Sequence, residues 1–153
     1  MTSKYFSFIE SHLRLLGNTE GLEQADINLI EDRFKVSLPK AYKEFLRFFG
    51  KESGNLLGSY LMESNKLQGN RDSAFEASID ELNNKSVEIK DSYFFFGQWQ
   101  GYVFYFFDCY EDNENPSIYI LTDSPKIEKY KNSFTEFVYD EGLKPLLQNK
   151  SPD

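Results

Sequence analysis

The sequence predicts an α+β fold in which helices pack around an antiparallel sheet, and two observations support this prediction. First, the stretch Tyr93–Leu121 holds three short apolar runs rich in aromatic and β-branched residues, which are the residues that strands favour. Second, helical periodicity fills most of the chain before this stretch and returns once after it. Helices and strands in separate runs are typical of α+β proteins.

The predicted sheet is a three-stranded antiparallel meander over Tyr93–Phe96, Tyr102–Phe107 and Ile118–Leu121. The loop Gly97–Gly101, with a glycine at either end, suits a tight hairpin between the first two strands. The acidic connection Asp108–Ser117 joins the last two. Both faces of the middle strand are apolar, so the strand is either covered on both sides or offers aromatic side chains to a partner on one of them.

The clearest helical stripe follows Pro39 and ends at Gly50, with apolar residues at positions i, i+3, i+4 and i+7: Tyr42, Phe45, Leu46 and Phe49. Proline suits the first position of a helix, where its missing N–H costs nothing. Ser133 and Glu136 form a capping box that predicts the start of a last helix. The remaining predicted elements are helices over residues 4–16, Gln24–Phe34 and Ala74–Leu82, a last helix from Ser133 that closes at Gly142, with Leu143–Leu147 continuing after a break at Pro145, and a short strand over Leu56–Met62.

Length and composition predict one globular domain over residues 1–153, with a polar tail at 148–153 that we expect to fray. Hydrophobic residues make up 40% of the chain and charged residues 27%, which is ordinary for a folded soluble protein. The formal net charge is −8. This acidity argues against nucleic acid as a direct ligand, because phosphate binding needs a basic surface. It favours either a basic partner or simple solubility.

Cysteine use and hydropathy predict a cytoplasmic protein. Cys109 is the only cysteine, which excludes an internal disulfide and fits a reducing compartment. No apolar run approaches the ~20 residues of a membrane-spanning helix, so we expect no membrane partner. Glu10 and His12 interrupt the first apolar stretch, and we therefore expect no signal peptide there.

The sequence shows no set of residues that would support catalysis. His12 is the only histidine and has no cysteine near it in sequence, so it predicts no zinc site. Cys109 lies beside Asp108 and Glu111, whose charges disfavour the thiolate that a nucleophilic cysteine needs. Phosphate-loop and EF-hand patterns are absent from the sequence. We therefore expect a protein that is not an enzyme, with no metal site and no cofactor.

The densest acidic cluster falls in the loop Asp108–Asn115, and it is the candidate binding site of the sequence. The cluster and its aromatic neighbours are Asp108, Glu111, Asp112, Glu114, Trp99 and Tyr110. Carboxylates on a loop attract a basic partner, and tryptophan and tyrosine are common anchors of protein interfaces. The competing interpretation is that Trp99 caps the core and that the acidic side chains only keep the loop soluble.

A family resemblance adds to these observations. The segment Leu38-Pro39-x-x-Tyr42-x-x-Phe45-Leu46, followed by Gly50, resembles the opening signature of the SUKH superfamily, the Smi/Knr-like proteins. Three later segments are similar to that family's strands and closing helix: Gly101–Asp108, Pro116–Leu121 and Ser133–Val138. This chain departs from the family where a glycine pair often follows the Leu-Pro helix, since here the sequence reads Gly50-Lys51-Glu52-Ser53-Gly54.

The resemblance implies an α+β fold and a role in binding other proteins. Bacterial members of the superfamily are immunity proteins, or antitoxins, that neutralise a cognate polymorphic toxin, often a nuclease. Eukaryotic members are regulatory or scaffolding proteins. The first hypothesis is therefore an immunity protein whose acidic loop occupies the basic cleft of a nuclease toxin. The alternative is a regulatory or scaffolding interaction domain with no toxin partner.

Overall fold

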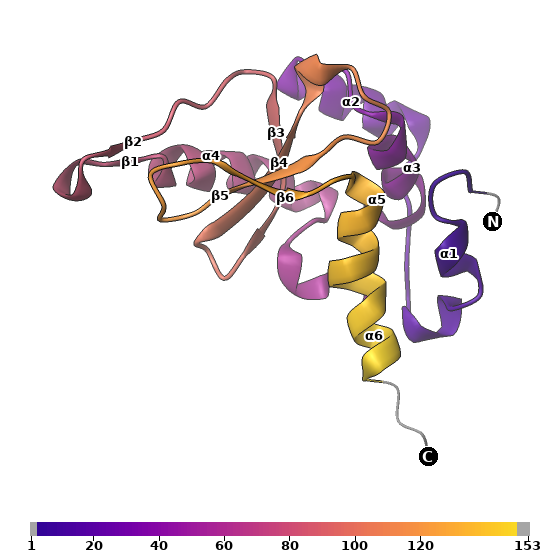
Figure 1. The fold of residues 1–153 in the computed structure, drawn as a ribbon. Helices are drawn as coiled ribbons and strands as arrows, with labels where there is room; N and C mark the ends of the chain where they lie inside the picture. The colour runs from indigo at the N-terminus through magenta and orange to yellow at the C-terminus, as the bar shows by residue number, and fades with distance from the viewer. Residues whose placement is uncertain (1–2, 150–153) are drawn as a thin grey trace.

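The computed structural model describes residues 3–149 and confirms the α+β architecture (Figure 1). A four-stranded antiparallel sheet and a separate two-stranded hairpin are accompanied by helices from both halves of the chain. The elements in chain order are α1 (Ser7–Glu10), α2 (Gln24–Phe34), α3 (Lys40–Phe49), α4 (Leu67–Ala77), β1 (Ile79–Asp80), β2 (Lys85–Ser86), β3 (Tyr93–Trp99), β4 (Val103–Asp108), β5 (Ile118–Leu121), β6 (Glu128–Lys131), α5 (Phe134–Phe137) and α6 (Lys144–Gln148). Of the tail 148–153 that we expected to fray, Gln148 ends α6, and residues 150–153 lie outside the described residues.

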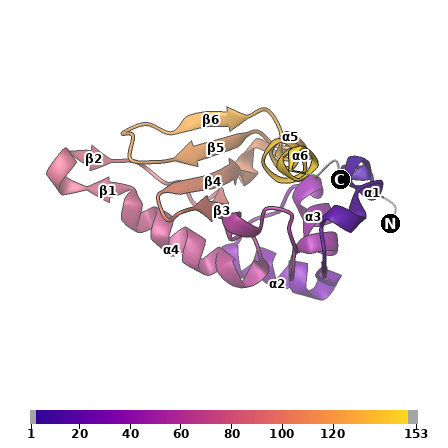
Figure 2. The ribbon, with the colours of Figure 1, turned by 90° about the horizontal axis from the view of Figure 1, so that it is seen from below.

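The main sheet has the strand order β3-β4-β5-β6, so every strand pairs with its neighbour in sequence (Figure 2). This order confirms the predicted meander and adds β6, which the sequence did not predict. Strand β6 reads Glu-Lys-Tyr-Lys and is largely exposed, so it lacks the alternating apolar pattern of a half-buried strand. Charged side chains, lysine above all, are common on edge strands because they discourage pairing with other molecules.

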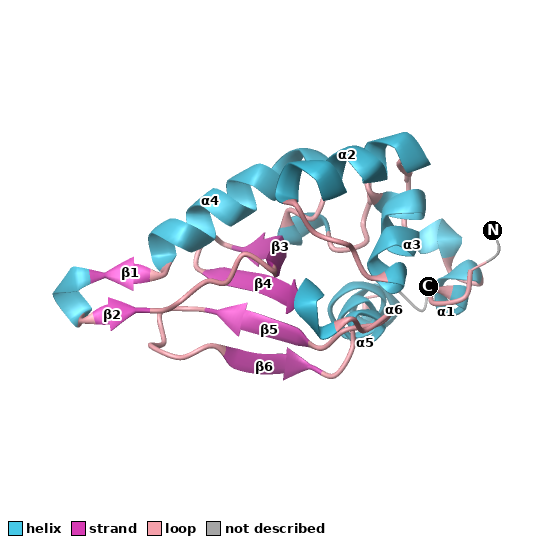
Figure 3. Cartoon of the chain, turned by 90° about the horizontal axis from the view of Figure 1, so that it is seen from above, coloured by secondary structure: helices cyan, strands magenta, loops and turns pink. Residues whose placement is uncertain are grey.

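Both faces of β4 are covered, which decides between the two interpretations of its apolar pattern. Tyr105 and Phe107 belong to the main core, where helices α3 and α5 pack against the sheet. Phe104 and Phe106 belong to a smaller cluster on the other face, together with Ala74 of α4. Figure 3 shows α4 running alongside the β3 edge of the sheet, with α2 and α3 at one end.

Helices α2 and α3 lie where their apolar stripes predicted them, and Pro39 occupies the cap position just before α3. The single helix predicted over residues 4–16 is wrong. The chain there forms α1 and a separate 3₁₀ turn, Leu13–Leu15. Asn55 bonds to this turn from a distant part of the chain. Its side-chain amide donates to the Leu15 carbonyl at 3.1 Å, and its backbone N–H donates to the Leu16 carbonyl at 2.7 Å. These carbonyls are therefore bonded across the fold and not along a longer helix.

Two predicted elements between α3 and β3 have the wrong bounds or type. The helix predicted over Ala74–Leu82 is displaced, because α4 ends at Ala77 and β1 begins at Ile79. The strand predicted over Leu56–Met62 is instead a 3₁₀ turn, Gly58–Tyr60. The flanking residues Leu57 and Leu61 have positive φ angles of 59° and 49°, which no strand can contain.

The last helix does not end at Gly142 as predicted. A π-helical turn, Val138–Leu143, joins α5 to α6, and Figure 1 shows the three as one column. Pro145 has no N–H to donate to the carbonyl four residues back, and the wider turn lies directly before it. Gly142 is buried, and a Cβ on it would lie 2.8 Å from a methyl carbon of Leu56. Its glycine therefore serves close packing and not helix termination.

Candidate partner-binding site

The loop Asp108–Asn115 begins with a local cap on its first turn. Asp108 is the last residue of β4, and its carboxylate accepts a hydrogen bond from the Tyr110 backbone N–H at 2.9 Å. This bond opens the 3₁₀ turn Cys109–Glu111. Asp112 closes the turn in the left-handed region, with φ of 49°. Asp108 is thus half-buried and engaged in the fold, so the outward face of the loop begins at Tyr110.

Glu114 ties the loop to α3 and to the start of the chain. Its backbone carbonyl accepts from the Ala41 N–H at 2.9 Å, which bonds one of the free amides of the first turn of α3. Its carboxylate lies 3.0 Å from the Lys40 ammonium and accepts from the Tyr5 hydroxyl at 2.8 Å. These hydrogen bonds, that of Lys40 first, lower the pKa of Glu114 to about 2.

Asn115 fixes the far end of the loop to the last helix. Its side-chain amide N–H donates to the Thr135 hydroxyl at 2.9 Å, and its side-chain oxygen accepts from the Thr135 backbone N–H at 3.1 Å. The loop is therefore capped internally by Asp108 and held to α3 by Glu114 and to α5 by Asn115. A loop held in this way loses little conformational entropy when it binds a partner.

Residues 110–114 of the loop are all exposed, and they include the Tyr110 ring and the carboxylates of Glu111 and Asp112. Tyr110 is 86% exposed, the second most exposed of the large hydrophobic side chains among the described residues. Glu111 is exposed and accepts from the Tyr119 hydroxyl at 3.0 Å, which orients its carboxylate. Asp112 is exposed, and no hydrogen bond or ion pair holds its carboxylate within residues 3–149. The loop thus offers an aromatic ring beside two carboxylates.

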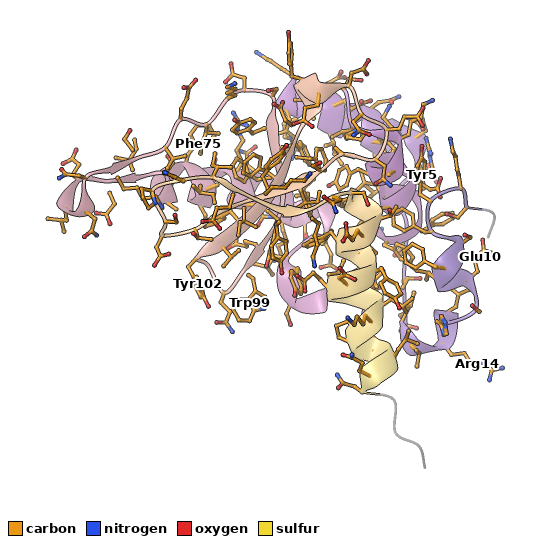
Figure 4. The ribbon with its side chains drawn as sticks, in the orientation of Figure 1. Tyr5, Glu10, Arg14, Phe75, Trp99 and Tyr102 are labelled. Atoms are coloured by element: carbon orange, nitrogen blue, oxygen red, sulfur yellow. The ribbon has the colours of Figure 1, made fainter. Side chains whose placement is uncertain are left out.

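Trp99 lies at the other end of the sheet. In the β3–β4 pairing Trp99 faces Val103, whereas Asp108 faces Tyr93, so the length of β4 separates Trp99 from the loop. This length is roughly 17–20 Å for six residues. Figure 4 shows Trp99 beside Tyr102 and far from Tyr5, the residue that contacts Glu114. Consecutive turns of a meander lie at opposite ends of its strands, so the predicted topology already implied this separation.

Cys109 and His12 are the two residues that the sequence offered for nucleophilic or metal chemistry. Burial, followed by the charge of Asp108, raises the pKa of the Cys109 thiol to about 12, so the thiol stays neutral. His12 precedes the 3₁₀ turn Leu13–Leu15. Over residues 3–149, no group of three or more His, Cys, Asp or Glu side chains is placed to hold a metal ion. Over the same residues, no helix has the length and apolar character needed to cross a membrane.

Comparison with known proteins places the chain in a family. A model of the family SUKH_6, described as SMI1-KNR4 cell-wall, matches residues 24–138, from the start of α2 to the beginning of the π-helical turn. A search of curated proteins found no match. The matched segment includes α2 to α5 and all six strands, and it therefore covers the Asp108–Asn115 loop. With well over half of its residues matched, this chain belongs to the SUKH (SMI1-KNR4) family.

Proposed function

We propose that this protein is a bacterial immunity protein that binds a cognate toxin in the cytoplasm and neutralises it. The proposed toxin is a nuclease whose basic cleft receives the loop Asp108–Asn115. In this proposal the protein acts by binding and blocking, without catalysis, cofactor or direct contact with nucleic acid. Membership of the SUKH family is consistent with this role.

One observation carries the proposal. The Asp108–Asn115 loop is fixed by Glu114 and Asn115 at its far side, and it presents Tyr110, Glu111 and Asp112 to solvent. Fixed carboxylates can stand in for the phosphates that a nuclease cleft binds, and an exposed tyrosine supplies desolvated contact area at the centre of an interface. Trp99 is too distant to join this surface, so Tyr110 is the aromatic anchor of the proposal.

The alternative is a regulatory or scaffolding domain with no toxin partner. The words "SMI1-KNR4 cell-wall" in the description of the matched family are the reason for retaining this alternative. The two functions differ in what the protein must do to a nuclease: an immunity protein abolishes its activity at equal concentration, whereas a scaffolding domain leaves it unchanged.

Co-expression with a nuclease toxin domain encoded beside its gene tests the proposal. We expect the protein to restore growth to cells that produce the toxin domain, and the purified pair to form a stable complex in which cleavage of DNA or RNA stops at a one-to-one ratio. A toxin domain that cleaves at its full rate in the presence of excess protein would overturn the immunity function and favour the regulatory alternative.

A further inference from the structure

A groove of about 680 Å³ separates the β1–β2 hairpin from the end of the main sheet. The hairpin continues from α4 and projects past the sheet, as Figure 1 shows. One side of the groove is lined by Glu76 of α4 and by Ile79 and Asp80 of β1, and the other by Tyr102 and Asp123. The groove opens at the β3–β4 turn, which is the end of β4 opposite to the Asp108–Asn115 loop.

Specific bonds fix the position of the hairpin across the groove. Lys85 of β2 is only 7% exposed, and its ammonium donates to the backbone carbonyl of Thr122, which follows β5. The Val87 N–H donates to the Ser78 carbonyl at 2.9 Å and ties the hairpin to the end of α4. The groove is therefore a defined feature of the fold, with one wall bonded to the other through Lys85.

Its walls carry apolar side chains that the core does not use. Ile79 is 60% exposed and Tyr102 is 53% exposed, and Leu82 at the tip of the hairpin is 96% exposed. The Trp99 ring packs edge-to-face on Tyr102, with ring centroids 5.8 Å apart, and supports the tyrosine from one side (Figure 4). An exposed aromatic ring that is held in place is typical of interface anchors.

The charges around the groove have one dominant sign. The carboxylates of Glu76, Asp80 and Asp123 form no ion pair within the described residues. Lys85 is the only basic residue lining the groove, and its ammonium is bonded to a backbone carbonyl. The next basic residue in sequence, Lys126, comes directly after Pro125 and does not line the groove. The Asp80 carboxylate accepts a hydrogen bond from the Asn83 side-chain amide at 2.7 Å. Apolar walls with carboxylates outside any ion pair complement a ligand that is both aliphatic and positively charged.

We propose that this groove binds a basic segment of a partner protein. Aliphatic side chains of the segment pack against Ile79 and Tyr102, while its lysine or arginine side chains face Asp80 and Asp123. This site is separate from the Asp108–Asn115 loop and does not depend on the identity of any toxin. The protein thus has two binding surfaces at opposite ends of β4.

A fluorescent peptide of alternating lysine and leucine is the probe for this site. We expect saturable binding that weakens with salt, with changes in the backbone amide NMR signals of Ile79, Tyr102 and Asp123. Two matched peptides separate the contributions: glutamate in place of lysine reverses the charge, and serine in place of leucine removes the apolar contacts. Both should bind at least tenfold more weakly than the original peptide.

Matched variants assign the peptide to the groove. Asp80→Asn together with Asp123→Asn should weaken binding roughly threefold to tenfold, as expected for two solvent-exposed charges. Tyr102→Ser should weaken it by about tenfold or more, as expected for an interface anchor. Asp112→Asn and Tyr110→Ser change the same residue types on the distant loop and should leave the affinity unchanged. All five positions are at least partly exposed, so thermal unfolding should confirm intact folding.

Several outcomes would overturn the proposal. Absence of saturable binding is one, and NMR changes centred on residues 108–115 are another. Wild-type affinity in the groove variants would also place the peptide elsewhere. Dimerisation in analytical ultracentrifugation that Tyr102→Ser abolishes would show that a second copy of this chain occupies the groove instead.

Discussion

At the scale of single residues, Tyr42 is buried at a cost to the fold. Its ring contacts Phe94 and Phe107 with centroids 5.3 and 5.2 Å away, and it is completely buried. Its hydroxyl is the one buried side-chain oxygen or nitrogen without a hydrogen-bond partner among the described residues. A buried hydroxyl without a partner costs roughly 1–3 kcal/mol. The ring is therefore useful to the core, and its oxygen is not.

Replacement of Tyr42 by phenylalanine separates these two parts. We expect Tyr42→Phe to raise the free energy of unfolding by about 1 kcal/mol, because it removes only the unbonded hydroxyl. Tyr42→Ala should lower it by about 3–5 kcal/mol, because it leaves a cavity among aromatic rings. Urea denaturation of both variants measures the difference. A loss of more than 1 kcal/mol in Tyr42→Phe would mean that the hydroxyl has a partner.

Glu114 gives the Asp108–Asn115 loop a dependence on pH. Lys40 and then Tyr5 lower the pKa of Glu114 from an ordinary value of 4.5 to about 2. The folded protein therefore favours the ionised carboxylate, and its stabilising effect is complete above pH 4.5 and lost as the pH falls through 2. Glu114→Gln removes this contribution, so the stability gap between wild type and variant should be largest near pH 6 and close towards pH 2.

Denaturation midpoints at pH 6, 4 and 2 provide the measurement. Asp112→Asn is the matched control, since no bond within residues 3–149 holds the Asp112 carboxylate. Its stability gap should stay constant over the same range. If the gap for Glu114→Gln is also constant, the contacts of Glu114 with Lys40 and Tyr5 do not hold the loop.

At the scale of elements, Gly21 allows the segment before α2 to approach the end of α3. A Cβ on Gly21 would lie 1.6 Å from the carbonyl oxygen of Arg47, which no small movement could relieve. The next residue, Leu22, donates its backbone N–H to the Leu46 carbonyl at 2.8 Å. The segment before α2 is thus packed directly onto the backbone of α3, and the absence of a side chain is what permits this contact.

Gly21→Ala should therefore lower the free energy of unfolding by about 3 kcal/mol or more, since backbone atoms must move to admit the methyl group. Gly69→Ala is the matched control within α4, where a Cβ would meet open space. It should raise the free energy of unfolding by about 0.5–1 kcal/mol, because alanine favours the helix. Equal effects of the two substitutions on denaturant midpoints would contradict the close packing at Gly21.

Sequence periodicity predicted the elements that bury a regular stripe, and it failed where burial is irregular. Helix α3 has a clear apolar stripe and strand β4 a continuous apolar run, and both lie where they were predicted. Strand β6 escaped prediction because its exposed side chains follow no apolar period. Leu57 and Leu61 adopt positive φ angles that leucine seldom has, and only packing with distant residues sets them.

The candidate site was predictable to a similar degree. The acidic loop is evident from the sequence, which leaves the exposure of Tyr110 open. The pairing of Glu114 depends on Lys40 and Tyr5, which lie far away in sequence. The groove beside β1 and β2 gave no sequence signal, because the hairpin strands have only two residues each. Contacts between distant segments thus decided which acidic side chains of the loop remain without an ion pair.

At the scale of the whole molecule, the net charge is −8, but not every carboxylate is free of a basic neighbour. At the loop, Glu114 is paired with Lys40, so the free charge is that of Glu111 and Asp112. The electrostatic attraction of these charges for a basic partner extends over about one Debye length, which is about 10 Å at 0.1 M salt and about 3 Å at 1 M. Charge of this kind chiefly raises the rate of association, whereas a buried anchor chiefly slows dissociation.

The last prediction follows from this division of roles and rests on the proposed function. Asp112→Lys should slow association with the toxin about threefold to tenfold at low salt, and the difference should disappear near 1 M salt. Tyr110→Ala should leave the association rate nearly unchanged and should speed dissociation about tenfold or more. Stopped-flow mixing over a series of salt concentrations measures both rates. Glu114 is left unchanged because it holds the loop to α3.

Glu52→Lys is the matched charge reversal, since Glu52 is exposed and lies beyond the C-terminal end of α3, whereas the loop contacts the N-terminal end. It makes the same change in net charge, so any difference between the two variants reports position alone. Association slowed by Asp112→Lys but not by Glu52→Lys places the interface on the loop. The reverse result would place it on the stretch Lys51–Asp72, and equal slowing would show that only the net charge attracts the toxin.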